Sequence, residues 1–290
     1  MITARKWMKL LVRHPFALAS TFPIAAEAAI RAILSEPQRS EPGSDPELLW
    51  WELRGNWILE AVEQTPREEC VNRFDRALCQ AQDYPADTYS ASQRIANAVY
   101  LIRSHPVEER SAVGRHMLQH LLRDIVAVRD RPEMRPLTRR FNNHLLNNYR
   151  AAVMLEASRD WLPGAPSMSG VIDAMVPVLE RHFRRLFSAD GVLLEGSVSY
   201  ELLGFKHLVD ISCCRPVDAF GARSIGWLSP QVERVRRTFY KSGKWLLPQI
   251  GDCSPDWNPG MIVLFLNGVV LGHETSYRRI WREELSAIGL

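Results

Sequence analysis

Apolar residues recur at three- and four-residue intervals along most of the chain, and this pattern predicts helices rather than strands. The expected helices cover residues 48–64, 67–82, 90–104, 107–127, 138–157, 170–187, 197–213 and 229–243. Helix breakers such as Pro66, Pro106 and Pro230 stand between them. Medium helices joined by short loops pack as layered helical hairpins, so we predict an all-α fold.

The C-terminal residues follow a different pattern. "MIVLFLNGVVLGH" (261–273) has two apolar, β-branched runs around Asn267 and Gly268, which predicts a β-hairpin. "SYRRIWREELSAIGL" then predicts a terminal helix, whereas the Pro-, Ser- and Glu-rich residues 35–47 predict a linker. We therefore expect three parts: an N-terminal helical segment with its linker (1–45), a helical domain (46–258), and a hairpin with a terminal helix (259–290).

Composition and charge exclude several classes of protein. The 290 residues are 46% hydrophobic, and 36 basic against 33 acidic residues give a net charge of +3. This balance does not indicate a nucleic-acid partner, and no stretch is long and apolar enough to predict a membrane span. The N-terminus begins with basic residues, but Arg13, His14 and Pro15 interrupt the apolar core that a signal peptide needs. We expect a cytoplasmic location, with the periplasm as the alternative.

The local clustering of charge and the cysteines restrict the function only slightly. Arginines cluster before residue 141 and predict either a solvated surface or attraction of an anionic ligand; they are Arg129, Arg131, Arg135, Arg139 and Arg140. The five cysteines match no disulfide framework and no zinc motif, and we expect them to be mostly reduced and buried; they are Cys70, Cys79, Cys213, Cys214 and Cys253. No glycine-rich phosphate loop is present. The sequence therefore predicts neither a metal nor another cofactor.

The stretch "FNNHLLNNYRAAVML" (141–155) combines a helical pattern with residues that form helices poorly. Asparagine competes with the backbone for hydrogen bonds, so four of them in two turns weaken the helix. Asn142 and Asn148 are expected to be loop or surface groups. Asn143, His144 and Asn147 are the candidates for a functional site.

Four stretches in this order together resemble the heparinase II/III family of polysaccharide lyases, which includes alginate lyases. They are "YSASQRIANAVYLI" (89–102), "NNHLLNNYRAAVML" (142–155) with "WLPGAP" after it, "LFSADGVLLEGSVSYELLGFKHL" (186–208), and "PQIGDCSPDW" (248–257). The resemblance covers about residues 48–258. It implies an incomplete (α/α) toroid whose inner helices line a groove for an acidic sugar chain. The family's usual β-sandwich domain carries a metal site in some members; here we expect no full β-sandwich, and residues 259–290 are expected to be at most a remnant of one.

The resemblance also implies roles for particular residues. Asn143 and His144 match the family's carboxylate-binding pair, and Tyr200 matches its catalytic tyrosine. Residues assigned to sugar contacts or to their support are Arg94, Arg139, Asn147, Glu195 and Ser197. Where family members commonly have a histidine after the tyrosine, this chain has Glu201.

These roles suit a lyase that cuts a uronic-acid polymer by β-elimination. The C5 proton is removed and the C4–oxygen bond breaks, so the adjacent carboxylate must be neutralised by hydrogen-bond donors. Asn and His side chains supply such donors, and a tyrosine can act as base and acid. The expected partner is therefore an acidic polysaccharide or oligosaccharide.

Two other functions remain open at this point. An inverting glycoside hydrolase would need two carboxylates across a groove, for which Glu195 with Asp252 or Asp256 is the available pairing. Alternatively, the chain binds an acidic polysaccharide without cleaving it, as an accessory protein of capsule or exopolysaccharide metabolism.

Overall fold

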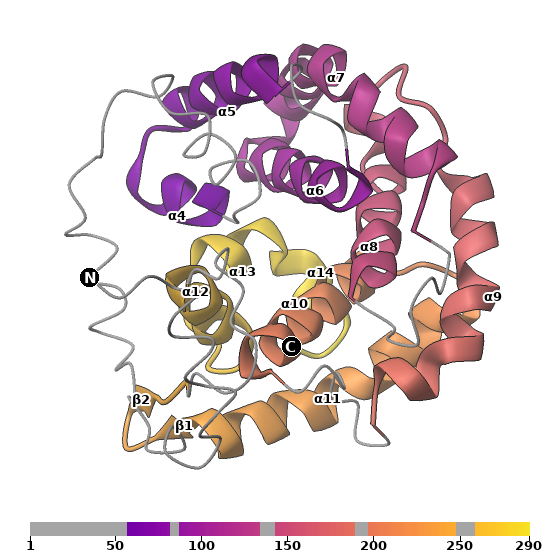
Figure 1. Cartoon of the computed structure of the whole chain (residues 1–290). Helices are drawn as coiled ribbons and strands as arrows, with labels where there is room; N and C mark the ends of the chain where they lie inside the picture. Colours follow the sequence, from indigo (N-terminus) through magenta and orange to yellow (C-terminus); the bar gives the residue numbers. More distant parts are fainter. Residues whose placement is uncertain (1–56, 82–86, 134–142, 189–196, 248–258) are drawn as a thin grey trace, which may run out of the picture.

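The computed structural model describes residues 57–81, 87–133, 143–188, 197–247 and 259–290 (Figure 1). The described residues are mostly helical, as the sequence predicts. The helices are α4 (Trp57–Gln64), α5 (Arg67–Ala81), α6 (Thr88–Ser104), α7 (Val107–Asp130), α8 (His144–Glu156), η1 (Arg159–Trp161), α9 (Ser169–Leu186), α10 (Val198–Cys213), α11 (Ala219–Phe239), α12 (Pro259–Val269), α13 (Ser276–Ile280) and α14 (Arg282–Ala287). In this part of the chain, one antiparallel pair, β1 (Tyr240–Lys241) and β2 (Lys244–Trp245), is the only sheet.

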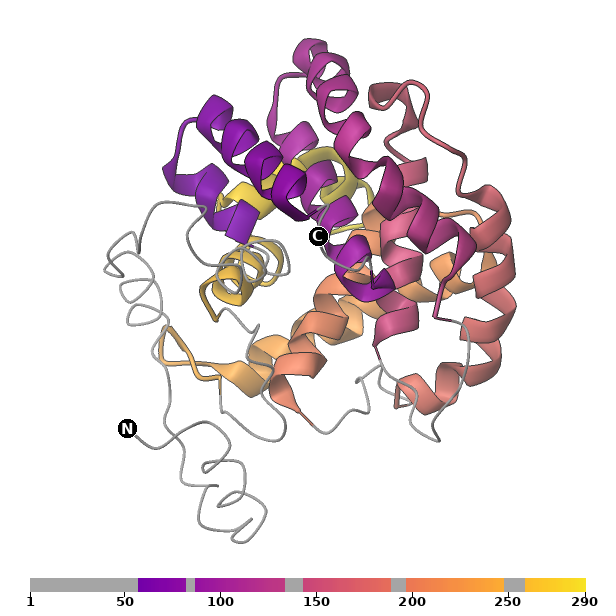
Figure 2. The same ribbon diagram turned by 45° about the horizontal axis from the view of Figure 1, so that its top comes forward.

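The helices pack mainly against their neighbours in the chain. Helix α6 contacts α7 and α8, α8 contacts α9 and α10, and α10 contacts α11 and α12. Figure 1 shows α5, α7, α9 and α11 lying outside α4, α6, α8 and α10. The C-terminal helices return to the beginning of the described chain, because α12 and α13 both contact α4, as Figure 2 also shows.

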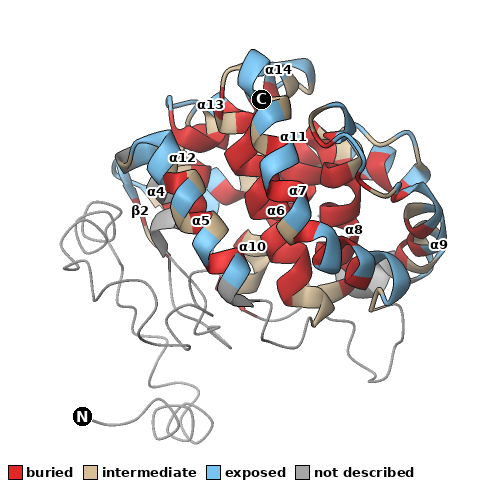
Figure 3. Ribbon diagram, turned by 90° about the horizontal axis from the view of Figure 1, so that it is seen from above, coloured by how far each residue is buried: buried red, intermediate tan, exposed pale blue. Residues whose placement is uncertain are grey.

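The two layers differ in burial (Figure 3). Every residue from 90 to 103 on α6 and from 145 to 155 on α8 is buried, whereas α5, α7 and α9 each have an exposed face. A helix that is buried on all sides cannot leave its polar side chains in water. The polar residues of α6, α8 and α10 must therefore bond to protein groups or to a ligand.

The predicted β-hairpin at 261–273 is wrong, because these residues form helix α12 and a following turn. The buried residues Ile262, Val263, Phe265, Leu266 and Val269 have the three- and four-residue spacing of a helix.

Tertiary contacts explain why an Asn-Gly pair lies in helix α12. Trp245 Nε1 donates to Asn267 Oδ1 at 2.7 Å. A Cβ on Gly268 would lie 2.5 Å from Thr275 Oγ1, at the start of α13, so the glycine permits this close packing. Residues 259–290 are thus helices packed on the rest of the chain, and they include no strand.

The predicted break at Pro230 is also wrong, because α11 runs through it. The helix begins ten residues earlier than expected, after Asp218, whose side chain accepts a hydrogen bond from Gly221 N at 2.9 Å. Helix α9 likewise contains Pro177. The other expected helices agree with the described ones to within a few residues, apart from the residues before 57 and 143, which lie outside the described part.

Among the described residues, no helix combines the length and the apolar character needed to cross a membrane.

Candidate functional site

Helices α6, α8 and α10 begin at the same end of the molecule. Asn147 Nδ2, on the first turn of α8, donates to the carbonyl of Tyr89 on the first turn of α6 at 3.2 Å. Near the other end, Tyr100 of α6 hydrogen-bonds Asp210 of α10. The three helices are therefore parallel, and the positive ends of their dipoles lie together, each worth about half an elementary charge. Such an end attracts anions.

Asn143 and Asn147 leave buried polar atoms unpaired at this end. Asn143 is 3% exposed, and its Nδ2 has no hydrogen-bond partner among the described residues; the same is true of Asn147 Oδ1. Asn143 stands at the N-cap of α8 without a side-chain capping bond. An unpaired buried donor costs about 1–3 kcal/mol, so a bound group that accepts its hydrogen bond would be favoured.

Asn148 is not the loop or surface group that the sequence predicts. It is fully buried and all its polar atoms are bonded. Its Oδ1 accepts from Glu133 N at 2.8 Å, and its Nδ2 donates to Thr88 O at 3.2 Å and to Ser92 Oγ at 2.9 Å. Asn148 therefore fixes the start of α8 against α6. Asn142 lies outside the described residues.

His144 is partly exposed and is held from two sides. Its Nδ1 lies 2.6 Å from Glu133 Oε2, and its ring lies on Tyr89 with centroids 4.6 Å apart. A carboxylate on one ring nitrogen fixes the orientation of the histidine ring. Sequence patterns do not indicate Glu133 as the partner of His144, because the two residues are eleven positions apart.

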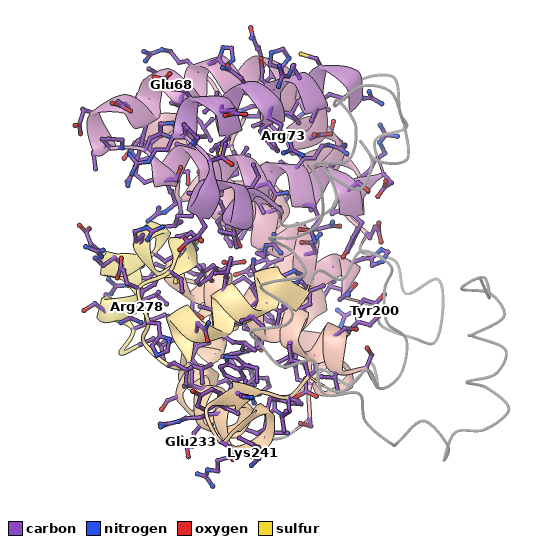
Figure 4. The ribbon with its side chains drawn as sticks, turned by 90° about the vertical axis from the view of Figure 1, so that its left-hand side faces the viewer. Glu68, Arg73, Tyr200, Glu233, Lys241 and Arg278 are labelled. Atoms are coloured by element: carbon purple, nitrogen blue, oxygen red, sulfur yellow. The ribbon has the colours of Figure 1, made fainter. Side chains whose placement is uncertain are left out.

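Tyr200 lies on the first turn of α10, where it is half-buried at the edge of the described structure (Figure 4). Ser197, the N-cap residue of α10, has its Oγ 2.7 Å from that of Ser199. Glu201 pairs with Arg234 of α11 at 2.5 Å. The carboxylate that follows the tyrosine is thus neutralised from within the protein, which reduces its repulsion of an anionic ligand.

Arg94 contacts a carboxylate of the protein itself. Its Nε and Nη2 each lie 2.7 Å from an oxygen of Asp124 on α7, in a buried two-point ion pair. This pairing joins α6 to α7 and offsets the charge that was expected to reach a sugar. Glu195 and Arg139 lie outside the described residues.

A buried charge network lies further along the same helices. The predictions made from the sequence do not include it. Asp210 Oδ2 accepts from Tyr100 at 2.5 Å and from Lys206 at 3.0 Å, and its Oδ1 accepts from Tyr277 of α13 at 2.7 Å. Arg150 Nε approaches Asp210 Oδ2 at 3.5 Å, which is a charge contact rather than a well-formed hydrogen bond. One carboxylate therefore connects α6, α8, α10 and α13.

Burial changes the pKa values of this network. Removal from water lowers the pKa of Lys206 to about 8, against the raising effect of Asp210. It lowers the pKa of His207 well below its usual range, and Arg150 and Lys206 act in the same direction. His207 is therefore neutral, and neither of its ring nitrogens has a hydrogen-bond partner among the described residues. The network holds two cations, Arg150 and Lys206, and one carboxylate, Asp210. Its net charge is therefore positive.

The spacing of polar residues could have predicted this polar interior. Asn143, Asn147 and Arg150 stand four and three residues apart, on one face of α8. Gln93, also buried, accepts from Arg150 Nη2 at 3.3 Å. The sequence signal for a polar interior is a set of polar residues at helical spacing within an otherwise apolar stretch.

Comparison with known proteins adds no relative, since no protein family, no curated protein and no solved structure matches this chain.

Proposed function

We propose that this protein binds an acidic polysaccharide or oligosaccharide and cleaves it by β-elimination. The order of helix contacts supports an incomplete (α/α) toroid, in which α6, α8 and α10 are inner helices and their first turns form the sugar site. The observation that carries the proposal is Asn143, with a buried and unpaired Nδ2 beside three parallel helix N-termini. A sugar carboxylate supplies both the acceptor and the negative charge that this end lacks.

The proposed reaction uses the neighbouring side chains. Asn143 and His144 hydrogen-bond the uronate carboxylate and stabilise the charge that develops when C5 loses its proton. Tyr200 takes that proton; the electron pair of the C5–H bond forms the C4–C5 double bond as the C4–oxygen bond breaks. The leaving oxygen then receives a proton from Tyr200.

Four contacts support the proposed arrangement of the site. Glu133 and Tyr89 fix the His144 ring, and Arg234 neutralises Glu201 beside Tyr200. Asn147, held by the Tyr89 carbonyl, keeps the first turn of α8 against α6. A catalytic group is effective only when its orientation is held in this way.

The test is ultraviolet absorbance of the unsaturated uronate, on alginate, heparan, chondroitin and hyaluronan. Tyr200→Phe should lower the rate by about 10²–10⁴-fold, as loss of a general acid–base group does. Tyr240→Phe is the matched control, because Tyr240 lies in β1 against Trp245, and it should keep full activity. Undiminished cleavage by Tyr200→Phe would exclude the proposed chemistry.

Binding without cleavage is a second candidate, favoured by the positive charge around Arg150 and by the helix N-termini, which need no catalytic tyrosine. A folded protein that binds one of these polymers but forms no unsaturated product on any of them would select it. The residues of the hydrolase alternative, Glu195 with Asp252 or Asp256, lie outside the described part.

A further inference from the structure

A group of metal-ligating side chains lies between the outer helices α5 and α7. Asp75 and Cys79 are one turn apart on α5, and His116 and His120 are one turn apart on α7. Asp75 Oδ2 lies 3.2 Å from His116 Nε2, and Asp75 Oδ1 lies 3.1 Å from His120 Nε2. Cys79 Sγ lies 4.0 Å from the same His120 nitrogen and 3.5 Å from Nδ1. The four side chains thus form one group between the two helices, with the donors of Asp75, Cys79 and His120 converging.

We propose that Asp75, Cys79, His116 and His120 bind a divalent transition-metal ion of the zinc class, which joins α5 to α7. One donor atom each from Asp75, Cys79 and His120 lies within 4.8 Å of the others. Tetrahedral zinc with its usual bond lengths needs donors about 3.4 to 3.8 Å apart, so side-chain rotations that move the donor atoms by about 1 Å bring them into place. His116, which is half-exposed, supplies the fourth position through a side-chain rotation.

The donor set selects the metal. A thiolate and imidazoles with one carboxylate suit zinc and similar ions, whereas calcium and magnesium prefer oxygen ligands alone. The Oδ1 of Asp75 is available to bind a cation, because this buried oxygen has no well-formed hydrogen bond among the described residues. Because a thiol binds a metal as the thiolate, metal binding must displace a proton, and the affinity should fall in acid.

Sequence patterns do not indicate this group of ligands. Cys79 and His120 are separated by 41 residues, and the two pairs have no short Cys/His motif. The site lies on the outer layer, apart from the first turns of α6, α8 and α10. It is therefore independent of the proposed lyase function, and its test does not depend on cleavage of any polymer.

The experiment is titration of the full chain, freed of metal with a chelator, with zinc chloride by calorimetry and with cobalt chloride by absorbance. We expect one equivalent bound in the micromolar range or tighter, with release of protons. Cobalt should give a thiolate-to-metal charge-transfer band that Cys79→Ser removes. His120→Asn should weaken zinc binding at least tenfold, since even residues that only support a ligand contribute this much.

The matched control is His273→Asn, an exposed histidine outside the cluster, which should leave affinity and the cobalt spectrum unchanged. His116→Asn should weaken binding without abolishing the charge-transfer band. The proposal is overturned if zinc binds only in the millimolar range. It is equally overturned if Cys79→Ser and His120→Asn both retain the original affinity.

Discussion

Both ends of α6, α8 and α10 hold buried polar residues, but the carboxylate of Asp210 at the deep end is fully bonded whereas the amide of Asn143 at the first turns is not. At the deep end, both oxygens of Asp210 accept hydrogen bonds, from Tyr100, Lys206 and Tyr277. At the end where the helices begin, Asn143 Nδ2 and Asn147 Oδ1 have no partner among the described residues.

This difference separates a structural role from a binding role. Burying a polar group costs free energy unless it is bonded, so Asp210 stabilises the fold because both its oxygens accept hydrogen bonds. The unpaired amide of Asn143 makes no such contribution, and a bound acceptor would stabilise it. The comparison predicts that changes at the deep end affect stability, and that changes at the first turns affect binding.

The largest expected effect is at Asp210. Asp210→Ala should lower the free energy of unfolding by about 3–5 kcal/mol, because it leaves Lys206 and two tyrosines buried without their acceptor. Denaturant unfolding measures this loss. Asp173→Ala, an exposed aspartate of α9, is the control and should change stability by less than about 0.5 kcal/mol. A loss below about 1 kcal/mol at Asp210 would contradict the assigned role.

A smaller effect concerns pH. Because the pKa of Lys206 is lowered to about 8 in the folded protein, the unfolded chain binds more protons above this pH, and stability from this group rises as pH increases. Between pH 8 and 10, the wild type should gain about 2 kcal/mol relative to Lys206→Met, from 1.36 kcal/mol per pKa unit.

Other groups also titrate in this range, so the difference between the two proteins is the informative quantity. Burial raises the pKa values of Cys213 and Cys214, whose contribution to stability falls as pH rises, but it does so in both proteins. Urea unfolding at several pH values gives the two curves. Parallel curves would show that Lys206 is not the titrating group.

The smallest stability effect should be at Asn143. Asn143→Ala removes no observed bond of its Nδ2, so it should lower stability by no more than about 0.5 kcal/mol while weakening polysaccharide binding. Asn148→Ala, five residues further along the chain and fully bonded, should cost about 1–3 kcal/mol. Equal losses at the two positions would remove the distinction between the two ends.

Helices α5 to α10 and helix α12 differ in how well the sequence predicts them. The helices from α5 to α10 were predicted to within a few residues where they are described, because their apolar spacing is regular and their ends carry breakers. Helix α12 was misread, because β-branched runs around Asn267 and Gly268 favour a hairpin locally. The packing of Thr275 against Gly268 outweighs that preference, and no local pattern reports it.

The candidate site was predicted in part. Asn143, His144 and Asn147 were selected because they weaken a helix, and the structure places all three at its start. Glu133, Arg150 and Asp210 were not selected, since their partners lie on other helices. Asn148 was assigned to the surface because its residue type favours turns, yet it is among the best-bonded residues of α8.

The sequence by itself determined the helical class, the positions of most helices and the unusual polarity of the chain at residues 142–148, because these depend on spacing and on local propensity. Only the tertiary structure decided which polar side chains are satisfied, that Asp210 joins four helices, and that Asp75 and Cys79 face His116 and His120. The physical reason is that hydrogen bonds and charge contacts act over a few ångströms in space, whatever the separation along the chain.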